Sequence, residues 1–302
     1  SFWYLSYTHP HPPLVPIHTY FERYTRKNIP LPLQSNWSNK TKIIFLNNIK
    51  NRWPEMSKEA IADVRRAFYA LCTHIDAQIR LVIGTLREEK LLDNTIIMIT
   101  SDHGDMLGDF GLFAKRLMYE NSARVPMILL GTKEDKIVGK GEVSNRLVGL
   151  ADIMPTLLDL AKIKIPSSCD GQSMFNKKPR TFLYAEANES INATRMVTSK
   201  NYKLVWYPYG NSFQFFDLAN DPKELEDVYQ KSEFQDHIET LKNILVKNLY
   251  GKDLSFLKEG KLVGISSDEI KSDNLKTGLG LLGERELLGQ RGLHYPPPPI
   301  DK

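Results

Sequence analysis

The stretch ITSDHGDMLGDFGLFAKRLMYENSARVPMILLG, residues 99–131, decides the fold. It begins inside the β-rich run 95–100 and ends in a second apolar run, 125–130, and both runs predict short buried strands. Before it, residues 57–90 carry apolar side chains at spacings of three and four, which predicts one long amphipathic helix. A helix leading directly into a buried strand is typical of α/β architecture, and residues 95–100 are expected to be a central strand of a parallel sheet.

The loop after the first of these strands carries side chains suited to an anionic ligand. Asp102 and His103 follow the carboxyl end of the strand, which is the edge of an open α/β sheet where ligands bind. An Asp oxygen and a His nitrogen are usual ligands of a divalent cation, and Lys115 adds a positive charge in the same loop. Cation and lysine together suit a sulfate or phosphate group. Taken alone, Asp102 and His103 equally fit a turn capped by the aspartate, and Lys115 alone is typical of a solvated surface lysine.

The amino-terminal stretch FWYLSYTHPHPP, residues 2–13, predicts a buried strand over residues 2–6 and then a proline-stiffened loop that carries His9 and His11. Either histidine could face a ligand or simply belong to the turn. The chain opens directly into this apolar run, so we expect the natural amino terminus to lie upstream of Ser1. The lack of a signal peptide therefore leaves the compartment open.

The pattern changes in the second half of the chain. Residues 152–163 predict a helix, four short runs between 181 and 217 predict an antiparallel sheet, and residues 234–250 predict a further helix. From residue 251 the chain is glycine-rich and then proline-rich, which predicts an extended tail that would join copies in a homo-oligomer. The predicted organisation is a catalytic-type domain over 1–165, an antiparallel subdomain over 166–250 and a tail over 251–302.

Composition excludes several classes of protein. The 302 residues are 41% hydrophobic and 25% charged, as in a folded globular protein. The net charge of +4 arises from 40 basic and 36 acidic residues, which gives no case for a nucleic-acid partner. No apolar run is long enough to predict a membrane span.

The complete loop string resembles the metal-loop signature of the sulfatase family in the alkaline phosphatase superfamily. The matching residues are Ser-Asp-His-Gly-Asp-x-Leu-Gly at 101–108, then Lys115, Tyr119-Glu120 and Val125-Pro126. Residues 149–163, 169–174 and 202–228 resemble later segments of the family, so the resemblance covers about residues 1–250. It is closest to arylsulfatase-like and choline-sulfatase-like members.

The resemblance implies a fold and a site. The fold would be α/β, with an alkaline-phosphatase-like mixed or parallel sheet flanked by helices, here incomplete, plus a small carboxyl-terminal antiparallel sheet with a helix. Asp102 and His103 would bind Ca²⁺, with Mn²⁺ or Mg²⁺ as alternatives, and Lys115 would contact the sulfate. His11 would face the ester and assist the leaving oxygen. It is preferred to His9 because two prolines follow it, as in the family's loop.

The chain also departs from the family pattern. The family's nucleophile is a formylglycine made from a Cys-x-Pro/Ala-x-Arg motif, and neither Cys72 nor Cys169 fits that motif. The family's paired aspartates and its Gly-Lys-x-His segment are also absent. We therefore expect the carboxyl-terminal portion of a sulfatase acting on a small-molecule or carbohydrate sulfate ester, inactive by itself. The alternatives are a phosphonate or phosphate ester hydrolase of the same superfamily and a non-catalytic binding protein on this fold.

Overall fold

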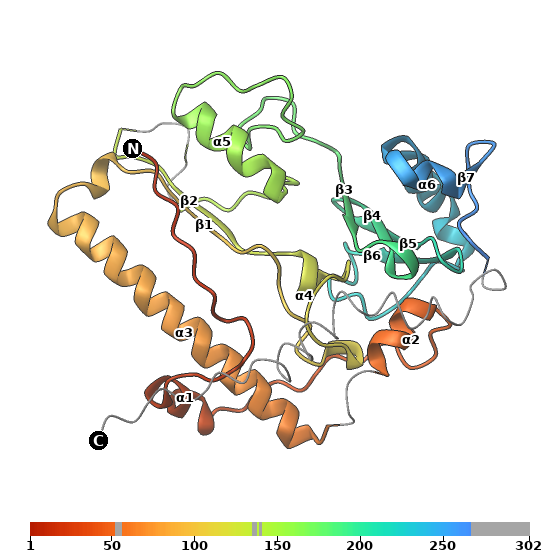
Figure 1. Cartoon of the computed structure of the whole chain (residues 1–302), viewed down its shortest axis with the longest axis horizontal. Coiled ribbons are helices and arrows are strands. Elements are labelled where there is room, and N and C mark those ends of the chain that lie inside the picture. The colour runs from red at the N-terminus through yellow and green to blue at the C-terminus, as the bar shows by residue number, and fades with distance from the viewer. Residues whose placement is uncertain (52–55, 135–137, 139–140, 267–302) are drawn as a thin grey trace, which may run out of the picture. The chain divides into compact units, whose positions relative to one another are not determined.

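The computed structural model describes residues 1–51, 56–134, 138 and 141–266 (Figure 1). The chain divides into two compact units, one formed by residues 1–40 and 49–181, the other by residues 41–48 and 182–302. The predicted boundaries after residues 165 and 250 stay predictions.

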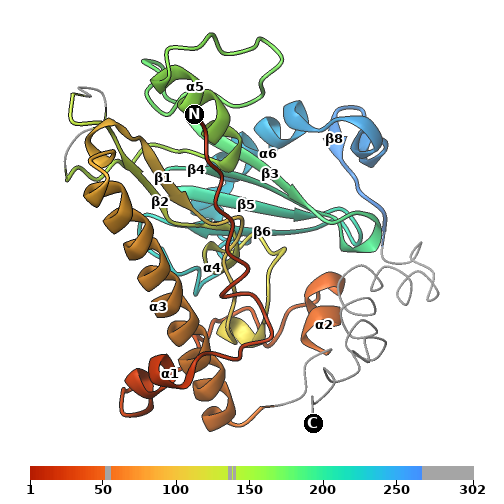
Figure 2. The ribbon, with the colours of Figure 1, turned by 60° about the vertical axis from the view of Figure 1, so that its left-hand side comes forward.

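Helices form much of the first unit. The predicted helix over 57–90 is confirmed as α3, Lys58–Glu88, and the Ser57 hydroxyl caps it by accepting a hydrogen bond from the Ala60 N–H (3.1 Å). Helix α1, His18–Thr25, lies against α3 (Figure 2), where the Tyr24 and Thr73 hydroxyls share a hydrogen bond of 2.6 Å. The short helix α2, Ile44–Lys50, runs across the division between the units.

The strands predicted over 95–100 and 125–130 are present, as β1, Ile97–Thr100, and β2, Met127–Leu130. They pair antiparallel, with Ile97 opposite Leu130, so the parallel neighbour expected for residues 95–100 is not found among the described residues. The connection holds only the single turns η2, Asp109–Gly111, and α4, Glu120–Ala123. It folds back on itself instead of crossing the sheet, so β2 returns in the opposite direction.

The rest of the first unit is built around one buried carboxylate. After the turn η3, Leu150–Asp152, the predicted helix over 152–163 is present as α5, Ile153–Leu160. Asp152 accepts hydrogen bonds from the N–H groups of Gly149 and Gln172, both at 2.9 Å, and pairs with Arg180. These contacts join the segment after α5 to the start of the helix.

One expectation for the amino-terminal region was wrong. Residues 2–6 form no strand, and the side chains of Phe2, Trp3 and Tyr4 are 75–81% exposed. A strand forms only where a neighbouring edge accepts its backbone hydrogen bonds, and within the described residues no edge pairs with this segment. Farther along the chain, residues 29–49 bury Trp37, Phe45 and other apolar side chains.

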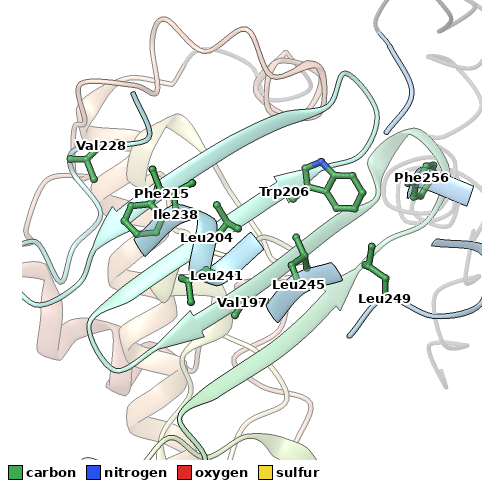
Figure 3. Close-up of a cluster of buried hydrophobic side chains, with 10 residues drawn as sticks. All are labelled: Val197, Leu204, Trp206, Phe215, Val228, Ile238, Leu241, Leu245, Leu249 and Phe256. Carbon is green, nitrogen blue, oxygen red and sulfur yellow. The ribbon is translucent and has the colours of Figure 1, made fainter. Parts of the chain in front are cut away.

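The second unit confirms the predicted antiparallel sheet with a helix. Strands β3 (Phe182–Ala187), β4 (Thr194–Ser199), β5 (Tyr202–Tyr207) and β6 (Ser212–Asp217) pair in chain order, joined by short turns that include η4, Ser190–Asn192. After the turn η5, Ser232–Phe234, helix α6, Gln235–Asn248, packs its apolar side on the sheet. The core between them (Figure 3) consists of Val197, Leu204, Trp206, Phe215, Val228, Ile238, Leu241, Leu245, Leu249 and Phe256.

The first part of the predicted tail is folded. Residues 251–266, expected to be extended, contain the 3-10 helix η6, Gly251–Phe256, and the hairpin of β7, Leu257–Lys258, with β8, Lys261–Leu262. Phe256 is buried in the core and Ile265 forms a bridge with Tyr209, which explains why this segment is ordered. Residues 267–302, with the proline run 295–299, lie outside the described residues. None of the described helices is both long and apolar enough to cross a membrane.

Candidate active site

The turn after β1 presents Asp102 and His103 side by side. The Asp102 side chain is 82% exposed, and its Oδ2 lies 3.4 Å from Nε2 of His103. Its other oxygen, Oδ1, accepts the His103 N–H at 3.0 Å, so the aspartate does cap its own turn. The capping and ligand interpretations are therefore compatible, because one carboxylate oxygen holds the turn while the other faces the imidazole.

The imidazole of His103 is oriented by its own backbone. Nδ1 lies 2.8 Å from the Gly104 carbonyl oxygen, which accepts only when Nδ1 carries the proton. In the neutral ring this leaves the lone pair on Nε2, the nitrogen that faces Asp102. Histidines that bind metals commonly donate their other N–H to a carbonyl in this way.

Lys115 meets His11 although 104 positions separate them in sequence. The Lys115 ammonium lies 2.8 Å from Nε2 of His11. Nδ1 of the same ring lies 2.7 Å from the Pro12 carbonyl oxygen, to which it donates. His11 is thus held as the tautomer whose Nε2 accepts from the lysine.

The competing candidate, His9, lies in different surroundings. Its ring centroid is 6.3 Å from that of His74 on α3, and Tyr20 stacks on His74 at 5.2 Å. The structure therefore brings His11, not His9, to Lys115. The catalytic roles assigned to these residues stay predictions.

Asp105 interacts with both His103 of the Asp102–His103 turn and Lys115 of the Lys115–His11 pair. It was not among the site residues identified from the sequence. The main-chain N–H groups of Leu107 and Ala114 donate to its carboxylate, and the charges of Lys115 and His103 both act on it. Burial nevertheless raises the pKa of Asp105 above its usual value, because desolvation outweighs these favourable contacts. A second acidic residue in the same loop, two positions after His103, was the available signal.

A buried aromatic cluster packs against the loop that carries Lys115. Trp37 lies with its ring centroid 4.9 Å from both Phe110 and Tyr119, and all three side chains are at most 7% exposed. Leu112 and Met106 are also fully buried here. The loop is consequently a packed part of the first unit, and Lys115 is placed by burial of its neighbours.

The donor set fits part of a divalent metal site. Asp102 and His103 supply one hard oxygen and one nitrogen on accessible, adjacent side chains, a pairing usual for such ions. Among the described residues, however, no group of three or more His, Cys, Asp or Glu side chains converges on one point. These two residues would thus be two ligands of a larger set.

Comparisons with family models identify the family of this chain. The model of the sulfatase family matches residues 1–163, which is more than half of the 302-residue chain. The chain belongs to the sulfatase family. A second model, described as N-sulphoglucosamine sulphohydrolase, C-terminal, matches residues 108–250. This sulfatase-family assignment confirms the resemblance drawn from the loop string.

Curated relatives are longer than this sulfatase-family chain. An arylsulfatase of Clostridium perfringens is 35% identical over 272 residues, which cover 86% of this chain and 55% of that enzyme. Human arylsulfatase K is 30% identical over 230 residues, covering 70% of this chain and 42% of the relative. The chain therefore spans about half or less of the length of these relatives.

Solved structures share the fold. The phosphonate monoester hydrolase of Silicibacter pomeroyi superposes with a TM-score of 0.71 at 22% identity, over 83% of this chain and 55% of that one. An enzyme solved with its substrate D-glucosamine-2-N,6-O-disulfate gives 0.67 at 21% identity, over 80% of this chain and 63% of that one. These similarities confirm the α/β fold class expected from the sequence.

Proposed function

We propose that the protein to which this chain belongs hydrolyses sulfate monoesters, with His11, Lys115, Asp102 and His103 as part of its active site. The observation that carries the proposal is the 2.8 Å contact between Lys115 and His11. It joins two motifs from distant parts of the sequence, and both motifs match the sulfatase pattern. Family membership supports the same reaction class.

Lys115 and His11 would act on opposite ends of the ester's reacting bond. The lysine ammonium would offset negative charge on the sulfate oxygens, and it would do so best as that charge grows in the transition state. His11 has Nε2 directed at the site, because its Nδ1 is held by the Pro12 carbonyl. Protonated there, it would act as a general acid toward the leaving oxygen.

Asp102 and His103 would hold a divalent cation, Ca²⁺ by resemblance, with Mn²⁺ or Mg²⁺ as alternatives. The cation would supply positive charge beside the sulfate oxygens. The exposed Oδ2 of Asp102 and the Nε2 lone pair of His103 are the donors available for it. The remaining ligands and the formylglycine nucleophile would come from other residues of the protein, since no Cys-x-Pro/Ala-x-Arg motif occurs in this sequence.

The proposed substrate class is a small-molecule or carbohydrate sulfate ester. The curated relatives are named arylsulfatases, and one structural neighbour was solved with a sulfated glucosamine. A second candidate is phosphonate or phosphate ester hydrolysis, because phosphonate monoester hydrolases are among the structural neighbours. A site of one cation, one lysine and one histidine suits either tetrahedral anion.

Parallel assays separate these reactions. The protein encoded by the complete open reading frame should hydrolyse an aryl sulfate faster than the matching aryl phosphate or phenyl phosphonate ester. Faster turnover of the phosphorus esters would replace the sulfatase proposal with the second candidate, and no turnover of any ester would favour a binding role. Residues 1–302 alone are expected to be inactive, so aryl sulfate hydrolysis by them would contradict the assigned mechanism.

A further inference from the structure

The backbone on both sides of Lys115 has an unfavourable conformation. Ala114 has φ of 62° and Arg116 has φ of 70°, both in the left-handed region. Each such non-glycine residue costs about 1 kcal/mol, and a strained pair persists only where the surroundings hold it. The loop therefore needs contacts strong enough to keep Lys115 at its place.

A buried arginine on α3 provides such contacts. The Arg65 side chain is 7% exposed, and its Nε donates to the carbonyl oxygen of Leu107 at 3.0 Å. Nη1 donates to the Pro30 carbonyl at 2.9 Å, and Nη2 forms an ion pair with Oδ1 of Asp109. One guanidinium thus joins the long helix, the segment before α2 and the loop that carries Lys115.

Asp109 extends this network toward the Asp102 turn. Its Oδ1 also accepts the Leu33 N–H at 2.7 Å, and its Oδ2 accepts a hydrogen bond from the Asn121 side chain. The Asn121 carbonyl oxygen lies so close to Gly104 that a Cβ there would stand 2.0 Å away. The Gly104 N–H in turn donates to the main-chain carbonyl oxygen of Ser122 at 2.8 Å. The network therefore reaches the residue next to His103.

We propose that Arg65, Asp109 and Asn121 are positioning residues. They fix Lys115 against His11 and hold the Asp102–His103 turn at its position relative to that pair. The assignment rests on the proposed function for its catalytic meaning. Its geometric content, the dependence of the Lys115–His11 contact on Arg65, stands independently. None of the three residues lies in the set predicted from the sequence.

Arginine cannot be replaced here by another cation. A lysine at position 65 keeps the charge but has a single donor group in place of the planar fork that reaches Leu107, Pro30 and Asp109 together. Arg65→Lys should therefore release the loop while leaving the buried carboxylate with a cation nearby. Arg195→Lys is the matched control, because Arg195 is a buried arginine paired with Asp253 in the second unit.

The experiment is NMR of histidine-labelled chain, residues 1–302, comparing wild type, Arg65→Lys, Asn121→Ala, Lys115→Met and Arg195→Lys. Lys115→Met defines the His11 ring signal without its lysine partner. Arg65→Lys is expected to move the His11 signal most of the way to that position. Asn121→Ala, a milder change that keeps the ion pair, is expected to move the His103 signal. Arg195→Lys should lower the unfolding temperature and leave both signals in place.

Two results would overturn the assignment. One is a folded Arg65→Lys or Asn121→Ala chain whose His11 and His103 signals coincide with those of wild type. The other is an equal movement in Arg195→Lys, which would make the effect one of general stability. In the protein from the complete open reading frame, Arg65→Lys should lower kcat/KM for an aryl sulfate about 100-fold, as small misplacements of a catalytic group do. An inactive wild type with the expected NMR shifts would reject the proposed function and keep the positioning network.

Discussion

At the scale of single residues, Gly104 shows how closely the site loop is packed. A Cβ at this position would lie 2.0 Å from the Asn121 carbonyl oxygen, which is backbone and cannot rotate away. Gly84, in the interior of α3, has nothing within 4 Å of the same virtual atom. An added methyl group would therefore clash at Gly104 but not at Gly84, a difference that the residue type alone does not show.

Gly104→Ala is expected to destabilise the chain by about 1–3 kcal/mol, because the backbone of the loop must shift to admit the methyl group. Gly84→Ala should stabilise it by about 1 kcal/mol, since alanine favours the helix and meets no neighbour. Urea unfolding measures both changes. A Gly104→Ala chain as stable as wild type would show that the loop does not lie against Asn121.

The predictability of the site residues follows from how local their partners are. Asp102, His103 and Lys115 were identified because they share one continuous string with a recognisable pattern. His11 was found through its proline context. Arg65 could not be found, because it reads as one polar position on an amphipathic helix and its partner Asp109 lies 44 positions away. Only the fold brings those two charges together.

At the scale of elements, α3 has a well-defined beginning. Ser57 has an extended backbone and its hydroxyl accepts the Ala60 N–H at 3.1 Å, so one orphan donor of the first turn is satisfied. The spacing of apolar residues predicted the 31 residues of this helix to within two positions at each end. The regular spacing of apolar residues was sufficient to predict this helix.

Ser57→Ala is expected to reduce the free energy of unfolding by about 1 kcal/mol, because the Ala60 N–H loses its acceptor. Ser57→Asp is the control, since an aspartate accepts the same hydrogen bond and its charge favours a helix amino terminus. Thermal and urea unfolding compare the three chains. Equal losses in both variants would mean that the hydroxyl does not act as a cap.

Strands were less predictable than helices, for a physical reason. Residues 2–6 have the apolar, aromatic character of a strand, yet they are exposed and unpaired with any edge among the described residues. Residues 181–217 were assigned correctly because each run meets its partner across a short turn. A strand whose partner is distant in sequence leaves no local evidence of its pairing.

At the scale of the whole molecule, buried carboxyl groups make stability depend on pH. Asp227 of the second unit accepts the N–H groups of Phe215 and Tyr229, both at 3.0 Å. Burial raises its pKa above the usual 3.8, because desolvation outweighs those hydrogen bonds. The folded chain consequently binds a proton at this group more tightly than the unfolded chain does.

The free energy of unfolding contributed by Asp227 should therefore be fully present below pH 3.8 and decline as pH rises through the raised folded pKa. Asp227→Asn lacks a titrating group and should lose this slope. Urea unfolding of both chains across acidic to neutral pH gives the difference directly. A difference between wild type and variant that stays constant, or grows in favour of wild type as pH rises, would contradict the assignment.

The central claim concerns the contact of Lys115 with His11, and its most direct test is the rate of aryl sulfate hydrolysis by Lys115→Met. In the protein from the complete open reading frame, this variant should lose kcat/KM by about 100-fold or more, because one charge donor to the sulfate is removed. Lys133→Met, which removes an exposed lysine paired with Asp93, is the control and should keep the wild-type rate. A Lys115→Met protein that hydrolyses the ester as fast as wild type would contradict the account.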